Sequence, residues 1–102
     1  MSRQHVRFAS KDSNHDDIVR DYERAYCNVV DLHALGIEGV PDLLVAMAGR
    51  AELVEIKTTD GELLPSQILF AKTWRGPKIV IARTQADVAR HVADVYRRVA
   101  RG

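Results

Sequence analysis

The sequence predicts an α/β domain in which three helices flank a mixed sheet of about four strands. Short apolar runs at residues 43–47, 53–56 and 78–82 have the length of strands and are separated by turn residues. Segments with helical periodicity come before, between and after these runs. The 102 residues are enough for one hydrophobic core and too few for two. We therefore treat residues 1–102 as a single domain.

Charge and cysteine content exclude several classes of protein. Fifteen Lys and Arg residues against fourteen Asp and Glu residues give a net charge of +1, which excludes a histone-like protein but allows a local basic surface. The single cysteine, Cys27, excludes an intrachain disulfide framework. No apolar run approaches the roughly 20 residues of a membrane span, and the N-terminus lacks the layout of a signal peptide. We expect a cytoplasmic protein without membrane contacts.

The first helix is predicted at residues 13–26, because apolar residues recur on one side at helical spacing. These residues are Ile18, Val19, Tyr22, Ala25 and Tyr26. Ser13 and Asp16 have the spacing of a capping box at the start of this helix. A short strand is predicted at residues 28–32.

The second half of the chain predicts a helix, a strand and a final helix. The helix covers residues 65–75, with Pro65 at a favourable first position. The strand covers residues 78–82, and the last helix starts near Thr84, which has capping-box spacing to Asp87. An apolar stripe on the last helix either packs on the sheet or forms a dimer seam. This stripe consists of Val88, Val92, Val95 and Val99.

Three charged residues lie on the predicted central hairpin. Taking Gly49-Arg50 as a two-residue turn places Asp42 directly opposite Lys57 and diagonal to Glu55. Because strand side chains alternate between faces, all three then share one face of the sheet. A three-residue turn would separate Asp42 from Glu55, so the length of the turn is a check on this grouping.

This grouping has two interpretations. In the first, Lys57 forms a cross-strand salt bridge with Asp42 or Glu55. In the second, Asp42 and Glu55 hold Mg²⁺, with the Ile56 backbone carbonyl as a third oxygen ligand. Lys57 would then orient or deprotonate a water molecule and neutralise phosphate charge during hydrolysis. The scattered histidines do not have zinc-ligand spacing, and a glycine-rich phosphate loop is lacking.

Pro41-Asp42, followed by Glu55-Ile56-Lys57, resembles the signature of the PD-(D/E)xK nuclease superfamily. The order of DSNHDDIV, GVPDLLV, LVEIKT, LLPSQ and WRGPKIVIART is similar to that of the VRR-NUC group and of small phage and archaeal Holliday-junction resolvases. This resemblance implies a restriction-endonuclease-like αβββαβ core. It also implies a structure-selective DNA endonuclease that acts in recombination or repair in a bacterial or phage-infected cell. The implied cofactor is Mg²⁺, for which Mn²⁺ substitutes, and the implied partner is branched or junction DNA.

The resemblance also assigns roles to individual residues. It makes Asp42 and Glu55 metal ligands and Lys57 the catalytic lysine. Gln67 matches a glutamine close to the active site or the DNA backbone, although it also fits an exposed helix residue. The family commonly has a further acid on the first helix, and Asp16 is preferred here for that weaker metal contact. Asp12 and Asp17 compete with it for this role.

The nucleic-acid contacts are expected from a basic N-terminal arm at residues 1–11 and from the rim of the site. The arm has the alternative interpretation of a frayed terminus. The candidate nucleic-acid-binding residues are Arg3, Arg7, Lys11, Asn14, Lys72 and Arg75. Cutting two strands of a junction requires two active sites, so a homodimer is expected. The alternatives are a non-catalytic DNA-binding or assembly module on the same fold, and an unrelated α/β domain in which the acids form salt bridges.

Overall fold

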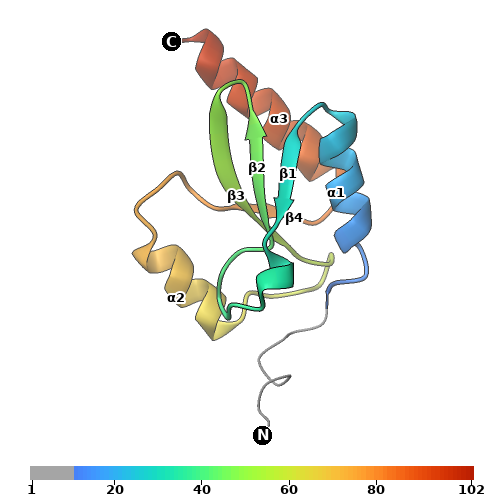
Figure 1. Cartoon of the computed structure of the whole chain (residues 1–102), viewed down its shortest axis with the longest axis vertical. Coiled ribbons are helices and arrows are strands. Elements are labelled where there is room, and N and C mark those ends of the chain that lie inside the picture. Colours follow the sequence, from blue (N-terminus) through green and yellow to red (C-terminus); the bar gives the residue numbers. More distant parts are fainter. Residues whose placement is uncertain (1–10) are drawn as a thin grey trace, which may run out of the picture.

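Residues 11–102, which the computed structural model describes, form a four-stranded sheet flanked by helices, as Figure 1 shows. The elements are α1 (His15–Arg24), β1 (Asn28–Asp31), the short 3₁₀ helix η2 (His33–Leu35), β2 (Leu43–Met47), β3 (Arg50–Ile56), α2 (Pro65–Thr73), β4 (Val80–Ala82) and α3 (Gln85–Ala100). This order confirms the predicted α/β class. α1 and α2 each end two residues earlier than expected, and β4 starts two residues later than expected. Within these residues, no helix is both long and apolar enough to cross a membrane.

The sheet is mixed and has the strand order β1-β2-β3-β4. β2 is antiparallel to both β1 and β3, whereas β4 is parallel to β3. The parallel pair requires a crossover connection, and α2 lies within it. Val54 pairs with Val80 and Ile56 with Ala82. The sheet therefore matches the predicted mixture of strand directions.

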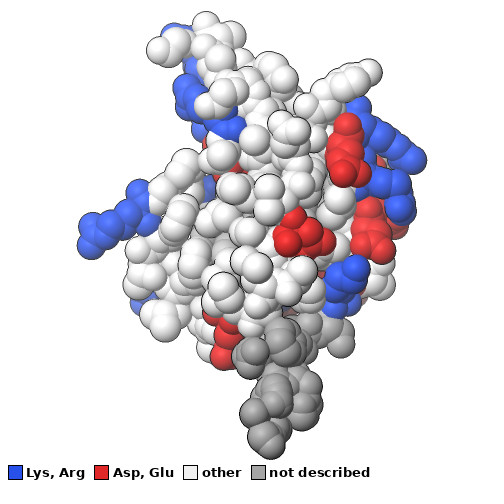
Figure 2. Space-filling model, in the orientation of Figure 1, with Lys and Arg blue, Asp and Glu red and all other residues white. Residues whose placement is uncertain are grey.

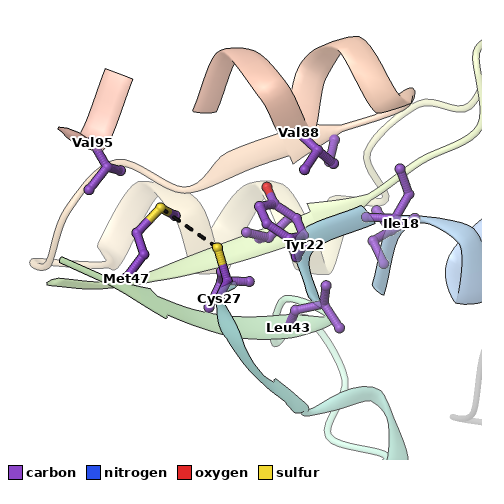
Figure 3. Packing of buried hydrophobic residues seen from close by; sticks show 11 residues of the cluster. Ile18, Tyr22, Cys27, Leu43, Met47, Val88 and Val95 are labelled. Carbon is purple, nitrogen blue, oxygen red and sulfur yellow. Dashed lines mark hydrogen bonds between the residues drawn. The ribbon is translucent and has the colours of Figure 1, made fainter. Parts of the chain in front are cut away.

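The core lies on one face of the sheet, under α1 and α3. On that face, alternate residues of β2 and β3 are buried against the two helices. Figure 3 shows Tyr22 and Ile18 of α1 and Val88 and Val95 of α3 pointing toward the strands. The Cys27 thiol lies 3.8 Å from the Met47 sulfur within the same cluster. Cys27 is a buried apolar contact, as expected for a single small residue in a core.

α2 stands apart from this core and has no buried residue. In Figure 1 it lies beyond one end of the sheet, next to the loop that contains η2. The loop and the helix approach closely, because a Cβ placed at Gly39 would lie 2.8 Å from the Ser66 carbonyl oxygen. Gly39 also has a positive φ of 85°, which other residues adopt with strain. This contact fixes the start of α2 beside the segment that leads into β2.

The position of the hairpin turn differs from the prediction. The two-residue turn is Ala48-Gly49, because Met47 pairs with Arg50 and Ala46 with Ala51. Both turn residues have positive φ, 52° and 76°, as a type I′ turn requires. Glycine favours the second of these positions, and the prediction of Gly49-Arg50 placed it in the first. The register changes by two residues, so every side chain stays on its predicted face.

Helix capping follows the sequence at α3 but not at α1. Thr84 accepts a hydrogen bond from the Asp87 backbone N–H, and Asp87 accepts one from the Thr84 N–H, which confirms the predicted capping box. Ser13 was expected to cap α1, but the N-cap position belongs to Asn14. The Asn14 side chain makes no local cap and instead bonds two distant carbonyl groups.

The valine stripe of α3 packs against the sheet. Val88 and Val95 are buried in the core, and Val92 and Val99 pack against it while partly exposed. This arrangement favours the packing interpretation over a dimer seam.

Asp87→Ala is expected to destabilise the protein by about 1 kcal/mol, because it removes a side-chain cap from α3. Asp87 accepts hydrogen bonds from two backbone N–H groups, of Arg83 at 2.8 Å and of Thr84 at 3.2 Å. The hydrogen bond from Arg90 and these backbone bonds lower the pKa of Asp87. A lowered pKa in the folded state stabilises the protein above the unfolded pKa and ceases to do so as the pH falls.

Urea denaturation at pH 7 and near pH 3 measures this effect. The stability difference between the wild type and Asp87→Ala should be largest at pH 7 and shrink in acid. Asp17→Ala is the control, since Asp17 is also in a first helical turn, and its carboxylate pairs there with the exposed Arg20 side chain. An equal loss in both variants would contradict the capping role.

Candidate active site

Asp42 and Glu55 lie directly opposite each other on the face of the sheet that α1 and α3 do not cover. Leu44 pairs with Leu53 and Leu43 with Val54, so the same register continued by one residue pairs Asp42 with Glu55. Directly opposed side chains in an antiparallel pair have Cβ atoms about 4.5–5.5 Å apart. The two carboxylates are thus closer than the diagonal placement predicted from the sequence.

Asp42 is held on both carboxylate oxygens. Its Oδ2 accepts a hydrogen bond from the Ile56 N–H at 2.8 Å, and its Oδ1 lies 3.2 Å from His33 Nδ1. The Asp42 side chain is 14% exposed. Asp42 directly precedes β2. Its side chain bonds the backbone of β3 just beyond the pair of Leu43 with Val54. This bond fixes the distance between the two strands at the site.

Glu55 is buried and contacts Gln67 from α2. Its Oε2 accepts a hydrogen bond from Gln67 Nε2 at 3.0 Å, while Gln67 Oε1 accepts one from the Leu64 N–H at 2.8 Å. Burial raises the pKa of Glu55 to about 9, with a further increase from the hydrogen bond to Asp42 and from its charge. Near neutral pH Glu55 therefore keeps its proton when no cation is present. Gln67, expected at the site, is indeed brought to it.

Lys57 is buried on the same face, two residues beyond Glu55. No ion pair within residues 11–102 joins its ammonium group to Asp42 or Glu55. The cross-strand salt bridge proposed as the simpler interpretation is therefore not formed. Burial raises the pKa of Glu55, and the positive charge of Lys57 partly offsets this increase.

Asn14 fixes the backbone at Lys57. Its Nδ2 donates to the carbonyl of Lys57 and to that of Arg83, both at 3.0 Å. These two carbonyls belong to the segments that leave β3 and β4. Asn14 was a candidate for binding nucleic acid, but in the structure both amide protons are used inside the chain. Its Oδ1 is buried without a hydrogen-bond partner among the described residues.

The acids near the start of α1 differ in their partners and in their electrostatic effect on the site. Asp16 is exposed and its carboxylate pairs with Lys11 at 3.2 Å, and Asp17 pairs with Arg20 at 2.6 Å. Neither contacts Asp42 or Glu55. Asp12 is partly buried, and its charge contributes to the raised pKa of Glu55. Asp12 is therefore the acid of this segment whose charge acts on Glu55, whereas the metal contact expected for Asp16 stays a prediction.

The remaining candidates for DNA contact lie on the surface or outside the described residues. Arg3 and Arg7 fall within residues 1–10, which the structure does not describe. Lys72 is exposed in the last turn of α2, and Arg75 is exposed shortly after this helix ends. Lys11 is half exposed in its pair with Asp16. Three of these residues are thus accessible to a ligand.

The donor set fits a hard divalent cation that keeps part of its water shell. Residues 11–102 contain no cluster of three or more His, Cys, Asp or Glu side chains suited to holding a metal ion. Two opposed carboxylates are nevertheless the number that Mg²⁺ sites in proteins often provide. The Ile56 carbonyl faces the same side of β3 as its N–H, which bonds Asp42, and so remains available as a third oxygen. Asp42, Glu55 and the Ile56 carbonyl are the groups that would hold the ion.

Two groups near or behind the site were missed by reasoning from the sequence. His33 contacts Asp42, and Asp31 in turn contacts the His33 backbone N–H at 3.1 Å. Their position was the available signal, since Asp31 ends β1 and His33 follows it closely, where β1 runs beside β2. On the opposite face, the buried Glu52 bonds His91 at 2.7 Å and Arg98 at 3.0 Å. An acid at a core position of an otherwise apolar strand is the sign that such partners exist.

Comparisons with protein-family models, with curated proteins and with solved structures find no match for this chain. The function is therefore argued from the geometry of the site.

Proposed function

We propose that the chain is a metal-dependent endonuclease that hydrolyses phosphodiester bonds in DNA. The observation that carries this proposal is the direct opposition of Asp42 and Glu55 on neighbouring strands, with Lys57 on the same face and not paired to either acid. Burial and the charge of Asp42 disfavour the ionised form of Glu55, and a cation held between the two acids would offset that cost. The resemblance to PD-(D/E)xK nucleases supports the same assignment of roles.

Asp42 and Glu55 would supply the negative charge that holds a cation. The pairing of β2 with β3 keeps the two side chains together even when no cation is bound. Asp42 is contacted by the Ile56 N–H on one oxygen and by His33 Nδ1 on the other, and Glu55 accepts one bond from the Gln67 amide. The remaining lone pairs of the two carboxylates are left for the ion. When bound, Mg²⁺ or Mn²⁺ supplies Lewis-acid activation of the phosphate and a more acidic water molecule. Lys57 lies on the same face, two residues beyond Glu55, and its ammonium group would stabilise negative charge that develops on the scissile phosphate.

The proposed substrate is branched DNA such as a Holliday junction. The domain formed by residues 11–102 would contact the shape and the backbone of the nucleic acid, because phosphate and sugar contacts position a protein without reading base sequence. Figure 2 shows that Lys and Arg lie toward the margins of the visible face, with few charges in its centre. One copy therefore offers no continuous basic band on this side, and two copies would extend the contact along a junction.

The proposed homodimer pairs through the edge of β4. The valine stripe of α3 is used inside the domain, whereas β4 is an edge strand whose Ile81 is 37% exposed. An apolar edge strand with free backbone groups is a common site of association. Light scattering at micromolar concentration checks the assembly, and a monomeric mass with and without junction DNA would contradict it.

The alternative is a non-catalytic DNA-binding or assembly module on the same fold. The lack of a third acidic or histidine ligand among residues 11–102 favours this alternative. It predicts DNA binding that does not depend on divalent ions and does not lead to cleavage.

Cleavage of a substrate panel separates the two functions. The panel contains a junction, a flap, a fork, a plain duplex and a single strand, each incubated with Mg²⁺, with Mn²⁺ or with EDTA. We expect cuts in the junction that require the metal. A Lys57→Met variant purified in the same way controls for a contaminating nuclease. Binding without cleavage of any substrate in Mn²⁺ would establish the alternative.

A further inference from the structure

The turn that follows β1 is attached to Asp42 at three points. The backbone N–H groups of Leu32 and His33 both bond the Asp42 carbonyl, at 2.8 Å and 3.1 Å. The His33 side chain then reaches the Asp42 carboxylate, with Nδ1 3.2 Å from Oδ1. A single histidine thus contacts both the main chain and the side chain of a candidate metal ligand.

The direction of the side-chain contact follows from the chemistry of the groups. An ionised carboxylate only accepts hydrogen bonds, so His33 Nδ1 is the donor. The other oxygen of Asp42 is held by the Ile56 N–H at 2.8 Å. With one donor on each oxygen, the carboxylate cannot rotate freely, and its remaining lone pairs keep a fixed direction.

His33 is itself held in place by a second layer of contacts. Its backbone N–H bonds Asp31 Oδ1 at 3.1 Å, and Asp31 Oδ2 lies 2.8 Å from Nε2 of the buried His15. The rings of His15 and His33 are 5.5 Å apart. The His33 side chain is 25% exposed, so water competes only partly for its bond to Asp42. The imidazole therefore has a defined orientation before any ligand binds.

We infer that His33 is a positioning residue that orients Asp42 for the binding of a divalent cation. This inference rests on the proposed function, because it assigns Asp42 as a ligand of that cation. Groups that hydrogen-bond a metal-binding side chain fix its orientation, and their loss typically lowers metal affinity by about 10- to 100-fold. His33 touches neither the cation nor the substrate in this role and acts only through Asp42.

Three substitutions of His33 test the donor role. His33→Asn keeps an amide N–H close to the position of Nδ1, His33→Gln places its amide near the position of Nε2, and His33→Phe keeps a ring without a donor. Mn²⁺ affinity is measured by isothermal titration calorimetry on wild type and variants. We expect His33→Phe and His33→Gln to weaken Mn²⁺ binding by about tenfold or more, and His33→Asn to stay close to the wild type. Junction cleavage should return in the weakened variants at higher Mn²⁺ concentration, with KM for DNA unchanged.

The outcomes distinguish this inference from the function on which it rests. Equal Mn²⁺ affinity in the wild type and all three variants would overturn the role of His33 and leave the metal site standing. Equal losses in all three, His33→Asn included, would show that the imidazole serves packing rather than donation and would also overturn it. A wild-type protein that binds no Mn²⁺ would overturn the proposed function itself. If His33→Phe does not fold, the comparison of His33→Asn with His33→Gln decides, since thermal unfolding checks both.

Discussion

Asp42→Asn is expected to abolish Mn²⁺ binding and DNA cleavage together, while the protein remains folded. The variant removes one of the two carboxylates that a cation needs and leaves only Glu55. The loss of affinity should exceed the roughly 100-fold seen when only a supporting partner of a metal ligand is removed.

The fold should tolerate this change because the asparagine carbonyl can still accept the hydrogen bond from the Ile56 N–H. The substitution also removes the Asp42 charge, which is one of the causes that raise the pKa of Glu55. Isothermal titration with Mn²⁺ and thermal unfolding measure the two effects separately. Unchanged Mn²⁺ affinity would contradict the assignment of Asp42 as a ligand.

Two further acids provide matched controls for this titration. Asp16→Asn should bind Mn²⁺ as the wild type does, because Asp16 is exposed and pairs with Lys11. Asp12→Asn should weaken binding moderately, because the charge of Asp12 is felt at Glu55. A loss in Asp16→Asn that matches the loss in Asp42→Asn would restore the acid preferred from the sequence.

Much of the fold could be predicted because its signals are local. The strands of the hairpin are apolar runs of the right length, and Thr84 with Asp87 caps a helix within one turn. The face shared by Asp42, Glu55 and Lys57 was also predictable, since it depends only on the alternation of side chains along a strand. A register error of two residues preserves that alternation, so the candidate acids were grouped correctly although the turn was misplaced.

The parts that could not be predicted depend on contacts between distant segments. Asn14 fails to act like a local cap because it bonds carbonyls 43 and 69 residues away. His33 reaches Asp42 only because β1 lies beside β2, which no spacing in the sequence specifies. Glu52 likewise finds His91 39 residues later in the chain. Local patterns identify which residues are charged on a buried strand, and the topology decides what they meet.

Lys57→Ala is expected to lower kcat for junction cleavage by about 10²- to 10³-fold, the usual cost of removing a positioned electrostatic group. Mn²⁺ affinity should change little, because Lys57 donates no oxygen ligand and pairs with neither acid in the described part of the chain. Its backbone stays anchored, since Asn14 binds the Lys57 carbonyl and the Lys57 N–H bonds the Ala82 carbonyl. Neither contact involves the side chain.

Two companion variants separate the charge of Lys57 from its bulk and from general attraction to DNA. Lys57→Met keeps a long apolar side chain in this buried position and should be as inactive as Lys57→Ala if the charge is what matters. Lys72→Ala removes an exposed positive charge from α2 and should instead raise KM and reduce the salt dependence of binding, with kcat nearly unchanged. Single-turnover cleavage at saturating Mn²⁺ measures the chemical step in all three variants. Wild-type turnover in Lys57→Met would show that the reaction does not need the ammonium group. Asp42 and Glu55 would then remain as a proposed cation site, and Lys57 would no longer belong to the catalytic residues.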